Sequence, residues 1–181
     1  MTEDGRKARG RRRRAELIAA TLAVVERDGV AGLTHRAVAR EVGCPASSAV
    51  YYFATLDDLL VAALSAAIDE YIGQLRELVA DGRSEVDAIA QLIADVGGPG
   101  RGRAMAEREL TLLAARRPAL RPIAQRWRDQ VVEVASQHTD DPATVLAFVD
   151  VSEGICARML LDIEPLGYDE IRTELLRVLG R

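Results

Sequence analysis

The stretch THRAVAREVGCPASSAVYYF, residues 34–53, decides the fold. Thr34 can cap the free N–H groups at the start of a short helix, and Gly43 can end that helix. Pro45 suits the first position of a second short helix, expected to run to Tyr52, because its missing N–H needs no partner there. Helices this short are barely stable alone, so a third helix must support the pair. The stretch therefore predicts a helix-turn-helix unit.

Helices on both sides of this stretch complete the pattern. Apolar residues in Arg11–Asp28 recur at the i, i+3, i+4, i+7 spacing of one helix face, and Gly29 closes the helix. Thr55 and Asp58 form an acidic variant of the capping box, which opens a long helix to about Val79. We expect the first of these helices to support the pair and the long helix to join it to the rest of the chain.

Breaks at glycine and proline divide the remainder into further helices. The abundant residues alanine, leucine, arginine and glutamate are good helix formers, and the sequence shows no β-type alternation and no internal repeat. We predict an all-α fold, with a three-helix helix-turn-helix head and a body of roughly six helices. After the long helix, the expected helices are Ser84–Val96, Gly102–Ala115, Ala119–Gln137, Ala143–Ile163 and Tyr168–Leu179.

Charge is distributed unevenly along the chain, whose net charge is −4. Residues 1–55 hold ten Lys/Arg and six Asp/Glu, a balance of +4, whereas residues 56–181 hold fourteen and twenty-two, a balance of −8. A basic head on an acidic body is typical of a protein that places one end on a polyanion. The acidic, apolar body argues against a nonspecific DNA-packaging protein.

Cellular location is indicated by the cysteines and by the apolar segments. Cys44 and Cys156 form no CxxC pattern, so we expect free thiols in a reducing cytoplasm. Arg11–Arg14 followed by Leu17–Val25 mimics a signal peptide, but the apolar run is short and no small-residue cleavage site follows it. No segment approaches the ~18 apolar residues of a membrane span. We therefore expect a soluble cytoplasmic protein without membrane contact.

Catalytic and metal-binding motifs are missing from the sequence. It contains no HExxH, GxSxG or P-loop pattern. His35 and His138 lack partners at ligand spacing, and the glycine-rich 97–102 stretch follows a helix and lacks the lysine of a phosphate loop. We expect no enzyme, no metal and no cofactor.

The chemistry of the helix-turn-helix points to double-stranded DNA. In such units the second helix enters the major groove, where small side chains allow close approach and serine hydroxyls pair with several bases. Tyrosine hydroxyls can reach phosphates, capped helix starts bind them, and an arginine arm can follow them or probe the minor groove. The candidate DNA-binding residues are Arg12, Arg13, Arg14, Thr34, Arg36, Pro45, Ala46, Ser47, Ser48, Tyr51 and Tyr52.

Each of these residues also has a structural explanation. The arginines can be a solvated charge run, the serines can be simple surface positions, and one of Tyr51 and Tyr52 can be a packing residue.

The region Ala15–Leu64 resembles the tetracycline-repressor (TetR) family of bacterial regulators. Glu107–Pro122 and Ser152–Leu161 look like segments common in one branch of that family. The motifs that carry the resemblance in the head are ERDG at Glu26–Gly29, LTHRAVAREVG at Leu33–Gly43, Tyr51-Tyr52-Phe53 and ATLDDLL at Ala54–Leu60.

The resemblance implies a homodimer that binds an operator and releases it when a small-molecule effector enters a pocket among the body helices. The dimer would form a four-helix bundle from residues 143–163 and 168–179 of each subunit, and Gly154 would let the partner helix approach closely. Residues 1–10 are polar and contain glycine, so we expect a disordered arm there. A DNA-binding domain over 11–55 and a ligand-binding and dimerisation domain over 56–181 follow. Repression is the family default.

Two positions depart from the family pattern. Cys44-Pro45 stands where a serine or threonine cap is usual, and Leu56 stands where a phosphate-binding lysine is usual. Leu56 cannot bind phosphate, so DNA affinity would depend more on the arginine arm. These departures keep one alternative open, a helical protein-interaction module with a vestigial DNA-binding head.

Pocket residues are harder to predict, because a lone aromatic or methionine at helical spacing is more often core. Asp150 and Glu153 lie in an apolar helix, where they could orient a ligand or pair with Arg158 across a dimer seam. The candidate ligand-binding residues are Tyr71, Met105, Glu109, Trp127, Phe148, Cys156 and Met159.

Overall fold

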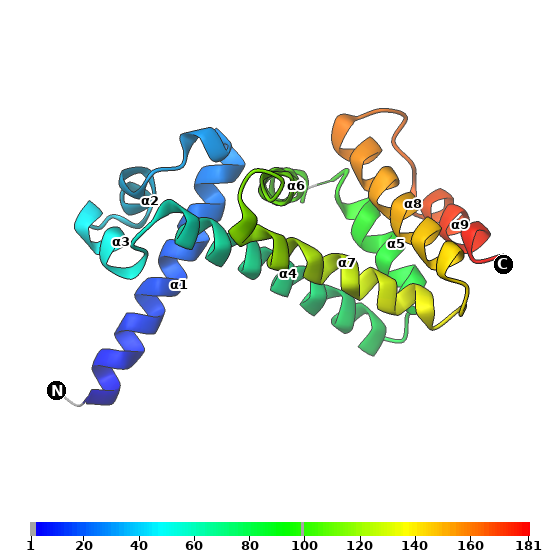
Figure 1. Cartoon of the computed structure of the whole chain (residues 1–181), viewed down its shortest axis with the longest axis horizontal. Helices are drawn as coiled ribbons and strands as arrows, with labels where there is room; N and C mark the ends of the chain where they lie inside the picture. Colours follow the sequence, from blue (N-terminus) through cyan, green and yellow to red (C-terminus); the bar gives the residue numbers. More distant parts are fainter. Residues whose placement is uncertain (1–2, 99) are drawn as a thin grey trace. The chain divides into compact units, whose positions relative to one another are not determined.

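The computed structural model describes residues 3–98 and 100–181, and among these it contains helices and no strand (Figure 1). The predicted all-α class is therefore confirmed. The elements in chain order are α1 (Glu3–Asp28), the short 3-10 helix η1 (Val30–Gly32), α2 (His35–Val42), α3 (Ala46–Tyr52), α4 (Leu56–Ala80), α5 (Glu85–Asp95), α6 (Arg101–Leu113), η2 (Pro118–Leu120), α7 (Arg121–Ser136), α8 (Pro142–Leu161) and α9 (Tyr168–Val178).

The start of α1 corrects the expected disordered arm over residues 1–10. Helix α1 already begins at Glu3, so residues 3–10 are helical, and Met1 and Thr2 lie outside the described residues. Arginine, lysine and alanine dominate residues 6–14, and these strong helix formers outweigh the helix-weakening effect of Gly5 and Gly10.

The chain divides into two compact units whose boundaries differ from the predicted 55/56 division. The first unit contains the chain up to Ala67 together with Met105–Arg121, and the second contains Ile68–Ala104 and Pro122–Arg181. Helices α4 and α6 therefore each contribute to both units. The expected boundary lies at the start of α4, whereas packing divides the chain within α4.

The core of the first unit forms where α1 packs against α2 and α2 packs against α3. Leu17, Leu22 and Val38 are buried on the inner faces of α1 and α2. Ala49 and Phe53 close this core from α3 and its C-terminal end. The supporting role predicted for Arg11–Asp28 is thus that of α1.

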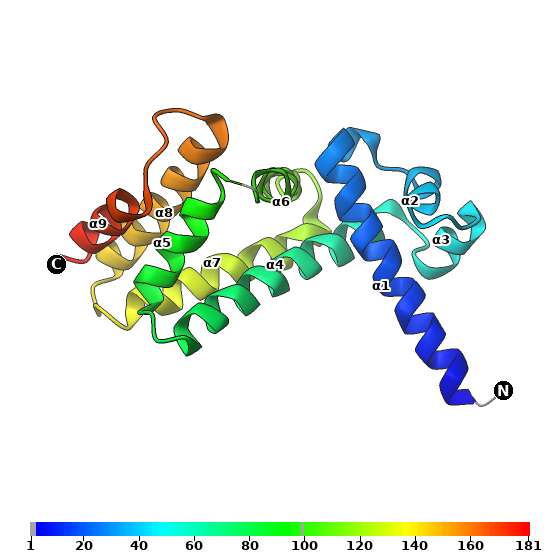
Figure 2. The same cartoon turned by 180° about the vertical axis from the view of Figure 1, so that it is seen from behind.

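The core of the second unit forms where α5, α8 and α9 pack on one another, as both views show (Figure 2). Phe148, Ile89, Ile171 and Leu175 are fully buried in it. The Arg172 Nε on α9 donates to the Asp87 carboxylate on α5 at 2.5 Å. Partial burial raises the pKa of Asp87, but the hydrogen bonds from Arg172 and Ser84 outweigh this effect and leave the pKa below its usual range.

Within the described residues, no single helix is long and apolar enough to cross a membrane. Helices α3 and α4 reach the required length and composition only together, as a pair bent by 73°.

Candidate functional site

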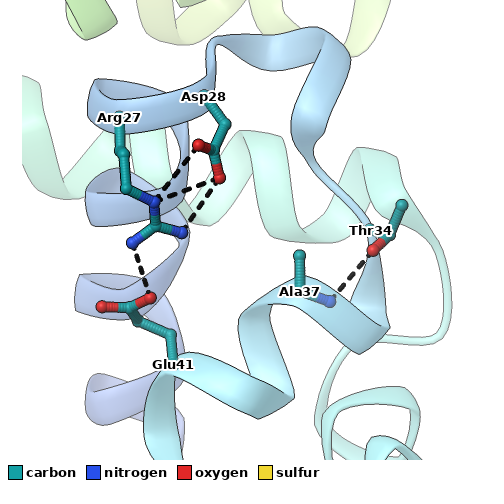
Figure 3. Close-up of polar contacts among 5 residues, drawn as sticks. All are labelled: Arg27, Asp28, Thr34, Ala37 and Glu41. Atoms are coloured by element: carbon teal, nitrogen blue, oxygen red, sulfur yellow. Dashed lines mark hydrogen bonds and ion pairs between the residues drawn. The ribbon is translucent and has the colours of Figure 1, made fainter.

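Helix α2 is held by a cap at its start and by an ion pair near its end (Figure 3). The Thr34 Oγ1 accepts a hydrogen bond from the Ala37 N–H at 2.9 Å, as the sequence predicts for a capping threonine. Arg27 at the end of α1 donates to Glu41 of α2 at 2.8 Å and also to Asp28. The bonds to Asp28 and then Glu41 raise the pKa of the Arg27 guanidinium above its ordinary value.

The turn from α2 to α3 depends on glycine. Gly43 has φ 69° and ψ 37°, the left-handed conformation that glycine adopts without strain. The Cys44 N–H then donates to the Ala39 carbonyl at 2.9 Å, which closes the end of α2. Pro45 is the N-cap residue of α3, with ψ 143°, rather than its first helical residue. The predicted α3 start is therefore one residue early.

The exposed side of α3 carries small residues, Val50 and one tyrosine. Pro45, Ala46 and Ser47 are exposed, and Ser48 is half-buried. Tyr51 is 83% exposed, the highest value among the large hydrophobic residues of the described chain. The structure thus presents the helix surface that the sequence proposed for base contacts.

Tyr52 lies differently from Tyr51. It is half-buried, and its ring meets the Tyr51 ring edge-on, with centroids 5.1 Å apart. A Cβ placed on Gly10 of α1 would lie 3.8 Å from the Tyr52 hydroxyl, so Tyr52 packs close to α1. This arrangement favours the packing explanation for Tyr52 and leaves Tyr51 as the outward tyrosine.

Replacing Tyr51 by alanine should weaken operator binding by at least about 1 kcal/mol, the range of one good contact. The Tyr51 ring is 83% exposed and meets Tyr52 edge-on, so circular dichroism should show an unchanged fold. Affinity is measured by fluorescence anisotropy on a fixed operator, with Tyr51→Phe separating the hydroxyl from the ring. If the folded Tyr51→Ala variant binds the operator with wild-type affinity, Tyr51 does not contribute to DNA binding.

The arginines of α1 have distinct surroundings. The Arg12 Nε donates to Glu16 at 3.1 Å although the Arg12 side chain is 83% exposed. Arg13 pairs with the same carboxylate at 2.9 Å, and the Arg14 guanidinium lies 4.9 Å from the centre of the Phe53 ring. Arg14 therefore helps to hold the end of α3 against α1.

The remaining predicted DNA contacts lie at the start of α2. Thr34 and Arg36 are exposed on the first turn of α2. At the start of α4, Asp58 accepts from the Thr55 N–H at 2.9 Å and Thr55 Oγ1 accepts from the Asp58 N–H at 3.1 Å, which is the predicted capping box. The hydrogen bonds from Thr55 hold the pKa of Asp58 below its usual range. Leu56 is half-buried there.

A cavity of about 430 Å³ lies within the second unit. Tyr71 of α4 lines it, and the Trp127 ring of α7 packs 5.8 Å from the Tyr71 ring. Of the predicted ligand-binding residues, the structure brings these two together. Polar residues that the sequence analysis missed line the cavity beside Tyr71, namely Glu70, Gln74, Asp95 and Arg103.

Other predicted ligand-binding residues lie elsewhere. Phe148 is fully buried and Met159 is 4% exposed in the apolar core, and Cys156 packs half-buried against that core. Met105 and Glu109 belong to the first unit. The Glu109 carboxylate accepts the Val30 N–H at 2.8 Å, so it satisfies a backbone donor just after the end of α1.

The outward side of α8 carries exposed leucines and a glycine beside the exposed carboxylates Asp150 and Glu153. Leu146 is 50% exposed and Leu161 is 66% exposed, whereas most large apolar residues of the described chain are buried. Gly154 is exposed, and a Cβ built on it would meet nothing within 4 Å. The helix therefore offers a surface that another helix could approach closely.

Comparison with known proteins agrees with this architecture. The family model described as tetracyclin repressor-like, C-terminal domain, matches residues 80–181. The multidrug binding protein EbrR complexed with ethidium is 38% identical, with a TM-score of 0.76, over 92% of this chain and 97% of that chain. No curated protein matches the chain.

Two further solved structures come from Streptomyces coelicolor. A TetR-family member from strain A3 is 38% identical, with a TM-score of 0.79, over 92% of this chain and 97% of that chain. A transcriptional regulator from strain A3(2) is 27% identical, with a TM-score of 0.78, over 93% of this chain and 99% of that chain. Fold and head geometry together define a helix-turn-helix transcriptional regulator. The chain belongs to the TetR family.

Proposed function

We propose that this regulator is a cytoplasmic repressor that binds a palindromic operator as a homodimer and leaves it when a small molecule binds the body. The observation that carries the proposal is the exposed surface of α3, held on a capped and ion-paired α2. Its small residues and Tyr51 suit contact with base edges and phosphates in the major groove.

Dimerisation is supported by the exposed apolar residues of α8. Leu146 and Leu161 are exposed in the single subunit, and Gly154 between them is exposed too. A second copy would cover this surface through the α8 and α9 helices of both subunits. A symmetric dimer would place its two heads on two half-sites of opposite orientation. The proposed operator is therefore palindromic.

A small-molecule effector is supported by the cavity in the second unit and by the relative EbrR, a multidrug binding protein with ethidium bound. The cavity volume lies within the ~300–1,000 Å³ usual for ligand pockets. We assign no catalytic role to the chain, in keeping with its relatives as transcription factors.

Selection of genomic fragments by the purified protein at physiological salt, followed by sequencing, tests the proposal. Enrichment of one palindromic motif, with half-sites about one helical turn apart or slightly more, supports a dimeric regulator. Enrichment of no motif, by protein shown to be free of bound small molecules by mass spectrometry, would contradict operator binding.

Replacing Arg12 by glutamine should lower the salt dependence of operator binding. Each phosphate contact contributes about 0.9 to the slope of log K against log salt, so a dimer that loses two contacts should lose about two units. The matched control is Arg76→Gln, which removes the same charge from an exposed position on α4. If both variants and the wild type show the same slope of log K against log salt, Arg12 does not contact phosphate.

A further inference from the structure

Helix α8 carries a continuous stripe of residues along its outward side. Residues spaced by three or four positions share one face of a helix, and Leu146, Asp150, Gly154, Arg158 and Leu161 follow this spacing. All of them are exposed in the single subunit except Arg158, which is half-buried. The stripe therefore has a leucine at each end, opposite charges inside the leucines and a glycine near its centre.

A groove of about 360 Å³ lies beside the first turns of α8, where α7 ends. Its apolar wall consists of Val132 from α7 and of Pro142, Val145 and Leu146 from α8, and polar side chains of α7 and the following loop line the rest. Leu146 is 50% exposed there, so apolar surface at this end of α8 faces solvent. Covering this surface with another apolar side chain would be favourable.

The other end of α8 carries exposed apolar side chains that could cover such a groove. Leu161 is 66% exposed, and Ile163, just after the helix, is 53% exposed. Arg101 of α6 holds this end, because its guanidinium donates to the Met159 carbonyl at 2.9 Å and to the Leu160 carbonyl at 2.6 Å. A fixed piece of backbone therefore presents the two apolar side chains to solvent.

The charges of the stripe distinguish between the two ways in which a pair of α8 helices can meet. In an antiparallel pair centred on Gly154, Asp150 of one subunit lies opposite Arg158 of the other, because each is four residues from the centre. A parallel pair would place like charges opposite each other, which is destabilising. The antiparallel pair also brings the Leu161 end of one helix to the Leu146 end of the other, where the groove lies.

Contacts within the subunit leave both charges able to pair with a second subunit. Asp150 lies 3.9 Å from Arg128, and its side chain is 62% exposed. Arg158 lies 3.7 Å from the Glu164 carboxylate and donates to the Glu164 carbonyl at 3.2 Å, and its side chain is 42% exposed. Ion pairs this long and open contribute little stability. Glu153, near the centre of the stripe, lies 3.5 Å from Arg128, which offsets the repulsion between two copies of this carboxylate.

We propose that Leu161 and Ile163 of each subunit insert into the groove between α7 and α8 of the other subunit, with the two α8 helices antiparallel and Asp150 paired with Arg158 across the dimer. The contact is self-complementary, so a twofold axis near Gly154 forms it twice. The inference rests on the proposed homodimer and adds which end of α8 meets which. It also assigns the groove an occupant, the end of α8 from a second copy of this chain.

Cysteine cross-linking in the full-length protein tests this pairing. Cys44 and Cys156 are first replaced by alanine, and Leu146→Cys and Leu161→Cys are then introduced singly and together. A short bismaleimide joins two cysteines only when they lie close together, and a denaturing gel shows the joined subunits. Within one subunit the two positions lie roughly 22 Å apart along α8, at about 1.5 Å per residue, so the reagent cannot join them there.

The double variant should cross-link in most dimers, whereas neither single variant should cross-link. Leu112→Cys combined with Leu146→Cys is the matched control, because Leu112 of α6 is also 66% exposed and lies outside the stripe. This control should give no more cross-linked product than Leu146→Cys alone.

A second measurement removes the inserted side chain without a reagent. Leu161→Ser should raise the dissociation constant of the dimer about 100-fold, because two leucines leave the interface and each contributes about tenfold. Leu112→Ser should leave the dissociation constant unchanged.

Cross-linking of a single variant with itself would overturn the inference, and so would a dimeric double variant that does not cross-link. Light scattering and operator binding of the cysteine-free parent separate these outcomes from failure of the proposed function. A dimer that binds its operator but lacks the cross-link between positions 146 and 161 remains a dimeric regulator with a different pairing. A monomeric parent contradicts the proposed homodimer itself and the inference with it.

Discussion

Replacing Gly154 by arginine should convert the proposed dimer to a monomer and lower operator affinity by about 100-fold or more. A Cβ at Gly154 meets nothing within 4 Å in the protomer, and arginine is a better helix former than glycine, so the subunit itself should fold at least as well. The long charged side chain would instead occupy the space that a partner helix needs. Separate heads lose the high effective concentration that a dimer gives the second half-site, commonly ~10²–10⁴-fold.

Gly73→Arg is the matched control for this experiment. Gly73 is also a helical glycine, on α4, with nothing within 4 Å of a built Cβ, and it lies outside the α8 and α9 surface. Light scattering after size-exclusion chromatography gives the oligomeric state, and anisotropy gives operator affinity. A dimeric Gly154→Arg protein with wild-type affinity would show that α8 does not pack closely on a partner at this point.

Replacing Phe148 by alanine should lower the free energy of unfolding by about 3–5 kcal/mol, the usual cost of removing a fully buried phenylalanine. Phe148 is fully buried in the core shared by α5, α8 and α9. Removal of the phenyl ring leaves a cavity that the surrounding helices can only partly fill. Urea unfolding at one fixed protein concentration measures the loss, because dimerisation would make stability depend on concentration.

This experiment also decides between two roles for Phe148, which the sequence proposed as a ligand-binding residue. Phe148→Leu keeps most of the apolar volume and should recover much of the stability. If instead Phe148→Ala keeps wild-type stability and loses ligand binding, Phe148 belongs to the ligand pocket.

Local chemistry explains which parts of the fold could be predicted from the sequence. The Thr34 cap, the Gly43 turn and the Thr55–Asp58 capping box involve residues no more than a few positions apart, and each occurs where the sequence predicts it. The bounds of α8 and α9 also lie within two residues of the expected ranges. Short-range signals of this kind depend on backbone geometry that a few side chains determine.

Contacts between distant residues could not be predicted in the same way. Glu109 accepts the Val30 N–H from 79 positions along the chain, and nothing in the ERELTLL segment distinguishes that role from a ligand contact. Glu70 and Arg103 resemble ordinary surface ions on amphipathic helices, and they define a cavity wall only once α4 and α6 are placed. The Arg-rich start of α1 was misjudged because charge and glycine indicated disorder, whereas helix propensity favoured continuation.

The bridge from Arg27 to Glu41 affects how the head meets DNA. Together with the Thr34 cap and the 2.8 Å contact between the His35 Nε2 and the Phe53 carbonyl, it orders α2 and α3 before any DNA is present. A preorganised reading surface has little conformational entropy left to lose on binding. In the proposed dimer, an ordered head would transmit a change in the distance between the two heads to the base contacts. A modest shift in the body would then be enough to weaken operator binding.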